Sequence, residues 1–111
     1  MGLLGKKKKP EWVRVASVDD FHRSTMVKVG KHEYALYKLD DGFFCTQNSC
    51  SHEYSPLSEG IVMGDEVFCE KHGSRFNIKS GRVVNLPATE DIKTFDVKLE
   101  GSDIFIFVPP A

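Results

Sequence analysis

Two short stretches in the middle of this 111-residue chain each combine a cysteine with a histidine. The first is Cys50-x-His52 and, after sixteen intervening residues, the second is Cys69-x-x-His72. Thiolates and imidazoles are the side chains that bind soft and borderline transition metals. Four such ligands in two segments require a fold that brings two loops together around one metal centre.

The spacing of these ligands bears on which metal centre they hold. Two cysteines and two histidines can close around one zinc ion, or they can hold a [2Fe–2S] cluster in which histidines bind one iron. Extended residues two apart project to the same side, so Cys50 and His52 would crowd a single ion. Structural zinc ligands usually have roughly two to four residues between them. The spacing favours a binuclear cluster, with Cys50 and Cys69 on one iron and His52 and His72 on the other, and leaves zinc as the alternative.

The segments that carry these ligands also resemble a known family. Residues 50–60 and 69–76 are similar to the two cluster-binding loops of Rieske ferredoxins, and residues 81–108 follow the pattern of the same family. The likeness covers about residues 12–108. It implies that Cys50, His52, Cys69 and His72 bind the cluster. It also implies that Pro87 belongs to a third loop that covers the cluster, although an ordinary turn proline is the alternative.

Rieske ferredoxins are small electron carriers of bacterial aromatic-ring dioxygenase systems. The resemblance implies a one-electron carrier with one Rieske-type [2Fe–2S] cluster, and not an enzyme. Its partners would be a flavin-dependent ferredoxin reductase, which supplies electrons, and a terminal ring-hydroxylating Rieske oxygenase, which receives them. The alternatives are the Rieske-like small subunit of another oxidoreductase, such as a nitrite reductase, and a structural zinc-binding module that mediates protein contacts.

Residues beside the ligands bear on the reduction potential. Histidine ligation raises the potential because the oxidised centre is formally neutral, whereas a four-cysteine centre carries a charge of about −2. High-potential Rieske proteins have a disulfide-forming cysteine where this chain has Lys71, and a tyrosine hydroxyl where it has Phe76. We therefore expect a low potential of about −150 mV. Ser74 would raise it by a hydrogen bond to sulfur, and the charge of Glu70 would lower it.

Outside the ligand segments the sequence predicts short strands. Segments rich in β-branched and aromatic residues are separated by the turn dipeptides Gly30-Lys31, Asp41-Gly42 and Gly101-Ser102. We predict strands over residues 12–16, 25–29, 32–39, 43–45, 94–99 and 104–108. The unbroken apolar run at 104–108 is typical of a strand that is buried on both faces. The pattern predicts an all-β fold, with an antiparallel β-sandwich or barrel as its base.

The segment between residues 46 and 87 differs from the rest. Glycines and prolines interrupt it, and all four predicted ligands fall within it. We expect a cluster-binding subdomain of about residues 46–87, inserted into a Rieske domain of residues 11–111 that follows a flexible basic leader of residues 1–10. Gly73 is expected to let the backbone approach the cluster sulfurs, where a Cβ would obstruct it.

Charge and cysteine content limit the partners and the compartment. Four of the fifteen basic residues are Lys6 to Lys9, which leaves 11 basic against 16 acidic side chains in the remainder. An acidic body argues against nucleic-acid binding. No apolar run is long enough to span a membrane, and no secretion signal is recognisable at the N-terminus. The third cysteine, Cys45, is expected to be a small buried hydrophobe in a reducing cytoplasm, and Trp12 a core residue. We expect a cytoplasmic monomer.

Overall fold

The computed structural model describes residues 9–50, 55–69, 73–86 and 88–109. These ranges contain strands and one short 3₁₀ helix but no α-helix, so none of the described residues forms a helix that could cross a membrane. The predicted all-β fold is confirmed. The elements are β1 (Glu11–Ser17), β2 (Ser24–Val29), β3 (His32–Leu39), β4 (Gly42–Gln47), η1 (Leu57–Glu59), β5 (Ile61–Met63), β6 (Glu66–Phe68), β7 (Arg75–Asn77), β8 (Thr94–Phe95), β9 (Val97–Glu100) and β10 (Asp103–Val108).

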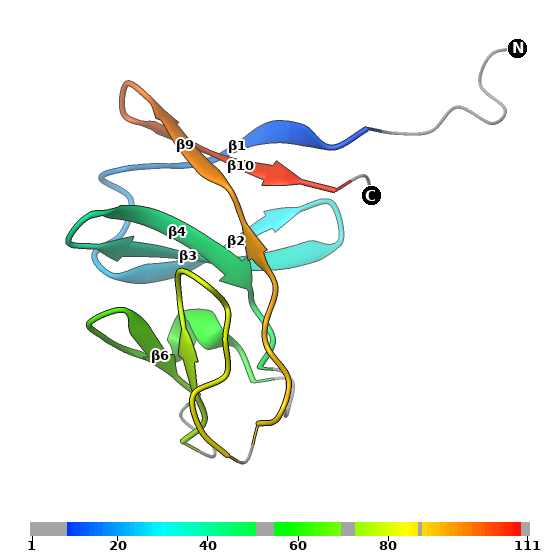
Figure 1. The fold of residues 1–111 in the computed structure, drawn as a ribbon. Helices are drawn as coiled ribbons and strands as arrows, with labels where there is room; N and C mark the ends of the chain where they lie inside the picture. The colour runs from blue at the N-terminus through cyan, green and yellow to red at the C-terminus, as the bar shows by residue number, and fades with distance from the viewer. Residues whose placement is uncertain (1–8, 51–54, 70–72, 87, 110–111) are drawn as a thin grey trace, which may run out of the picture.

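Two antiparallel sheets form the base of the molecule. Their strand orders are β1-β10-β9 and β2-β3-β4-β8, and Figure 1 shows the first sheet above the second. Apolar side chains from both sheets meet between them, as in other β-sandwiches. We call this cluster the base core; it consists of Ala16, Val27, Tyr34, Leu36, Cys45, Ile104, Ile106 and Val108.

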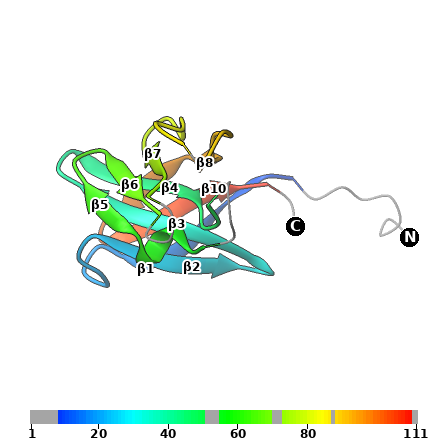
Figure 2. The ribbon, with the colours of Figure 1, turned by 90° about the horizontal axis from the view of Figure 1, so that it is seen from below.

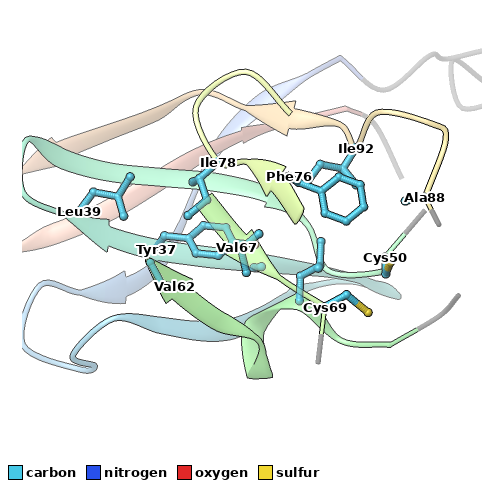
Figure 3. Packing of buried hydrophobic residues seen from close by; sticks show 12 residues of the cluster. Tyr37, Leu39, Cys50, Val62, Val67, Cys69, Phe76, Ile78, Ala88 and Ile92 are labelled. Atoms are coloured by element: carbon cyan, nitrogen blue, oxygen red, sulfur yellow. The ribbon is translucent and has the colours of Figure 1, made fainter. Parts of the chain in front are cut away.

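A third, smaller sheet of order β5-β6-β7 lies on the other side of the β2-β3-β4-β8 sheet. It comes between β4 and β8 in the sequence, and Figure 2 shows it in front of β3 and β4. Its apolar side chains and those of neighbouring segments, β3 among them, form a second cluster, which is shown in Figure 3. We call it the subdomain core; it consists of Ala35, Tyr37, Leu39, Cys50, Leu57, Val62, Val67, Cys69, Phe76, Ile78, Ala88 and Ile92.

Strand β3 contributes to both cores. Tyr34 and Leu36 belong to the base core, whereas Ala35, Tyr37 and Leu39 belong to the subdomain core. Successive residues of a strand point to opposite faces, so one strand can fill two cores by alternation. The third sheet therefore packs directly on β3, an inner strand of the base.

A buried hydroxyl pair joins β3 to β4. The Thr46 hydroxyl donates to the carbonyl of Gln47 at 2.8 Å, so the Tyr37 hydroxyl donates to Thr46 Oγ1 at 2.9 Å. Burial raises the pKa of Tyr37, and the hydrogen bond to Thr46 only partly opposes that rise. The tyrosine stays neutral and its hydroxyl is satisfied inside the subdomain.

The structure corrects two expectations at the C-terminal strand. β10 is not buried on both faces: alternate residues enter the base core, while Phe105 and Phe107 point outward. Trp12 is not a core residue either, because it is 39% exposed and packs on Phe107 with ring centroids 5.1 Å apart. Within the described part of the chain, only one face of the β1-β10-β9 sheet is covered. The apolar run at 104–108 therefore combines aliphatic residues on the covered face with two phenylalanines on the outer face.

The strand predicted over 94–99 is interrupted at Asp96. β8 pairs with β4 in one sheet, and β9 pairs with β10 in the other. The Asp96 carbonyl accepts a hydrogen bond from the Phe107 N–H at 2.9 Å. The chain therefore crosses from one sheet to the other within a single alternating segment, which periodicity alone does not show.

Candidate metal centre

Cys50 and Cys69 stand at the start of two loops that are closed in the same way. The Cys50 N–H donates to the Ser55 carbonyl at 3.0 Å, and the Cys69 N–H donates to the Ser74 carbonyl at 2.8 Å. The next residues outward are antiparallel partners in both loops, Ser49 with Pro56 and Phe68 with Arg75. Each loop therefore begins and ends next to a pair of β-bridged residues, and the first residue of each loop is a cysteine.

Both cysteines are thiols that are almost completely buried. Cys50 is 3% and Cys69 is 2% exposed, and both belong to the subdomain core. Figure 3 shows them at the same end of that core as Ala88, with Leu39 at the opposite end. Two buried thiols from two neighbouring loops suit a shared metal centre with sulfur ligands.

The two predicted histidine ligands, His52 and His72, lie outside the described residues. Only Cys50 and Cys69 of the predicted ligand set can therefore be placed. Among the residues that the structure describes, no group of three metal-binding side chains occurs. The complete set of Cys50, His52, Cys69 and His72 stays a prediction.

The first cysteine loop is anchored by Asn48, at the end of β4. The side-chain oxygen of Asn48 accepts the Ser58 N–H at 2.9 Å, and the backbone carbonyl of Asn48 accepts the Leu57 N–H at 2.6 Å. The side-chain nitrogen Nδ2 of Asn48 donates to the carboxylate of Glu33, on β3, at 3.3 Å. One buried asparagine therefore connects the loop, the 3₁₀ helix η1 and the base.

The second cysteine loop contains Gly73, for which the sequence analysis expected a close approach to the cluster. That expectation is untested, and the structure gives a further reason for glycine. Gly73 has φ +74°, a left-handed conformation that L-residues adopt at a cost, and its N–H donates to the Cys69 carbonyl at 2.8 Å. Gly73 therefore forms the turn that returns the chain to β7.

Ser74 connects the second loop to the segment that follows β7. Its hydroxyl oxygen is buried and accepts the Ala88 N–H at 3.1 Å. The predicted hydrogen bond from Ser74 to a cluster sulfur is untested. Phe76, at the position of the tyrosine in high-potential proteins, is fully buried in the subdomain core.

Sequence reasoning missed Asn85. Its side chain bonds the backbone on both sides of Ser74, because it accepts the Arg75 N–H at 2.7 Å and donates to the Gly73 carbonyl at 3.3 Å. The neighbouring Leu86 is 74% exposed. Pro87, the residue predicted to mark a third loop, lies outside the described residues. The sequence signal that could have identified Asn85 is its position directly before Leu86-Pro87, which was predicted to belong to a loop near the cluster.

Charged side chains in three turns are paired with each other. Lys79 forms ion pairs with Asp41, in the β3–β4 turn, and at 3.5 Å with Asp65, in the β5–β6 turn. The hydrogen bond with Lys79 lowers the pKa of Asp41, and the same bond raises the pKa of Lys79. This pairing ties the subdomain to the base at the end of the molecule marked by Leu39.

Residues 11–96 match the family model described as Rieske [2Fe-2S] domain. The chain belongs to the Rieske [2Fe–2S] domain family. The cofactor of a Rieske domain is one [2Fe–2S] cluster, so this match and the pair of buried thiols together favour the cluster over zinc.

Curated and solved Rieske proteins resemble most of this chain. The ferredoxin component of naphthalene 1,2-dioxygenase/salicylate 5-hydroxylase systems from Ralstonia sp. is 34% identical, over 86% of this chain and 93% of the relative. The ferredoxin of Sphingomonas yanoikuyae B1 superposes with a TM-score of 0.83 at 28% identity, over 89% of this chain and 100% of that one. A complex of reduced oxygenase and oxidised ferredoxin in carbazole 1,9a-dioxygenase matches with a TM-score of 0.77 at 29% identity, over 85% and 99% of the two chains. The predicted resemblance is confirmed.

Proposed function

We propose that this Rieske protein is a one-electron carrier that delivers electrons to a terminal ring-hydroxylating oxygenase. The observation that carries the proposal is the pair of buried thiols, Cys50 and Cys69, on two loops of matching closure in a Rieske domain. The similar proteins are ferredoxin components of dioxygenase systems, and one solved neighbour is a ferredoxin with its oxygenase. These support transfer of an electron rather than catalysis by this chain.

The ligand set that we propose is Cys50 and Cys69 for one iron and His52 and His72 for the other. When bound, the cluster takes up one electron and releases it again. The residues of this chain hold it: the thiols bind as thiolates, and their burial in the subdomain core keeps water from the sulfur side. Because Phe76 supplies no hydroxyl, we propose a potential of about −150 mV, and a voltammetric value above about +100 mV would contradict it.

Three further points remain proposals. The electron donor is a flavin-dependent ferredoxin reductase, the compartment is the cytoplasm and the protein is a monomer. Support for the donor comes from the relatives, which are named as components of multicomponent dioxygenase systems. Support for the cytoplasm comes from Cys45, which is a thiol, as expected in a reducing compartment.

The metal centre is tested by changing one cysteine at a time. The Cys50→Ser variant removes a ligand, so the purified protein should lose iron, sulfide and the visible absorption of the cluster. The matched control is Cys45→Ser, which changes an equally buried cysteine in the base core and should leave the iron content at the wild-type level. Wild-type protein that is isolated without air and contains no iron would contradict the proposal.

A further inference from the structure

The amide of Asn85 lies beside the backbone of the second cysteine loop. It accepts the Arg75 N–H at 2.7 Å and donates to the Gly73 carbonyl at 3.3 Å. These two backbone groups flank Ser74, whose carbonyl accepts the Cys69 N–H. A single side chain therefore fixes the backbone on both sides of the residue that closes the loop.

Asn85 acts where a β-ladder comes to an end. Residues 82–84 run antiparallel to β7: the Asn77 N–H donates to the Arg82 carbonyl and the Val84 N–H donates to the Arg75 carbonyl, both at 2.8 Å. Phe76 and Val83 form the bridge between these two bonds. The ladder therefore leads from the far end of β7 toward the second cysteine loop.

The next positions of the ladder are filled by the Asn85 side chain instead of the backbone. In a regular antiparallel ladder the Arg75 N–H would donate to the Val84 carbonyl, and the Gly73 carbonyl would accept from the Leu86 N–H. Asn85 Oδ1 replaces that acceptor and Nδ2 replaces that donor. The main chain can then leave the ladder at Leu86, which is exposed, while the loop remains closed.

We propose that Asn85 is a positioning residue for the metal centre, which it serves by holding the loop that presents Cys69. The proposal rests on the proposed role of Cys69 as a ligand. A side-chain amide suits this place because it combines one acceptor and two donors in a plane, as a peptide unit combines one of each. Without it, Gly73 and Arg75 lose two hydrogen bonds, which should raise the frequency of loop opening by about tenfold or more.

The test compares Asn85→Ala with Asn77→Ala in the cluster-loaded protein. Asn77 is a matched control, because its Oδ1 also accepts backbone N–H groups, those of Lys79 at 3.0 Å and Ser80 at 2.9 Å, but in the turn at the other end of β7. Three quantities are measured. They are the hydrogen exchange of the Cys69 and Gly73 amides, the rate at which a chelator removes iron, and the midpoint potential.

We expect Asn85→Ala to accelerate both rates by about tenfold and to raise the potential, because water that reaches the Cys69 sulfur donates hydrogen bonds to it. Asn77→Ala should keep the wild-type rates and potential. The Asn85→Asp variant keeps the acceptor for Arg75 but loses the donor to Gly73, so its rates should be intermediate. It also gives the answer if Asn85→Ala does not fold.

Equal rates in the Asn85 and Asn77 variants would overturn the proposal, and so would an Asn85→Asp protein that behaves as the wild type. Wild-type protein without iron would instead overturn the proposed function. In that case the exchange of the Cys69 and Gly73 amides in the iron-free chain still decides whether Asn85 holds the loop.

Discussion

The three cysteines of this chain are all buried, but their surroundings differ. Cys50 and Cys69 lie at one end of the subdomain core, whereas Cys45 lies in the base core among aliphatic and aromatic side chains. Burial raises the pKa of the Cys45 thiol to about 12. Cys45 is therefore an apolar packing residue, as its place after Phe43 and Phe44 predicts.

A pH series tests the state of Cys45. The pKa of the thiol is near its ordinary value of 9.0 in the unfolded chain and about 12 in the folded one. Because the folded pKa is the higher one, the thiol contributes stability that is fully present below pH 9.0 and is lost as the pH rises toward 12. Between pH 9.0 and 12, the free energy of unfolding measured in urea should fall more steeply with pH for the wild type than for Cys45→Ala. The difference in slope should be about 1.4 kcal/mol per pH unit. Identical slopes would contradict a buried neutral thiol.

At the scale of the elements, glycine has two different uses in the turns. Gly64 (φ +59°) connects β5 to β6, and an added Cβ would have open space around it. Gly81 (φ +78°) lies between β7 and residues 82–84, and an added Cβ would lie 2.1 Å from the Ile92 carbonyl oxygen. The Gly81 carbonyl also accepts the Ile92 N–H at 2.8 Å. Gly81 is therefore required by conformation and by close packing, and Gly64 by conformation alone.

Alanine substitutions separate these two uses. Gly64→Ala should destabilise the protein by about 1–2 kcal/mol, the cost of a left-handed conformation for an L-residue. Gly81→Ala should cost about 2 kcal/mol more, because the backbone of Ile92 must also move. Thermal unfolding of both variants measures the difference. Equal losses of stability would show that the contact at Gly81 is relieved without cost.

Most strands of the base could be predicted from the sequence, apart from the division of residues 94–99 between two sheets, whereas those of the subdomain could not. β2 and β3 are long enough to show a pattern and are separated by Gly30, which has φ +61°. β5, β6 and β7 have three residues each, too few for a period to be recognised. The ligand spacing located the cysteine loops, but the anchoring by Asn48 and Asn85 depends on tertiary contacts that no local pattern encodes.

At the scale of the molecule, the ends of the subdomain differ in character. The end marked by Leu39 carries the ion pairs of Lys79 with Asp41 and Asp65. The cysteine end carries Leu86, an exposed apolar side chain next to Asn85. An exposed apolar residue beside the proposed cluster, on a chain whose body is acidic, suits an apolar contact with a redox partner inside a polar rim.

Electron transfer to the oxygenase tests this contact. Leu86→Glu should lower the second-order rate constant by about tenfold, because a carboxylate must be desolvated in the interface. The added carboxylate should also lower the midpoint potential, as expected for Glu70, but a lower potential of the carrier favours transfer and so cannot account for a slower rate. The control is Leu99→Glu on β9, another exposed leucine (47%), which should keep the wild-type rate constant. Stopped-flow mixing of reduced carrier with oxidised oxygenase measures both; similar losses in the two variants would place the contact elsewhere.

Strand β3 supplies side chains to both cores, and this has a consequence for protein engineering. A peptide limited to residues 46–87 would lack Ala35, Tyr37 and Leu39, and its hydrophobic interior would open to water on one side. Transplanting the two cysteine loops into a foreign scaffold therefore requires a donor strand with the alternation of β3. An iron site grafted without that strand should not survive purification.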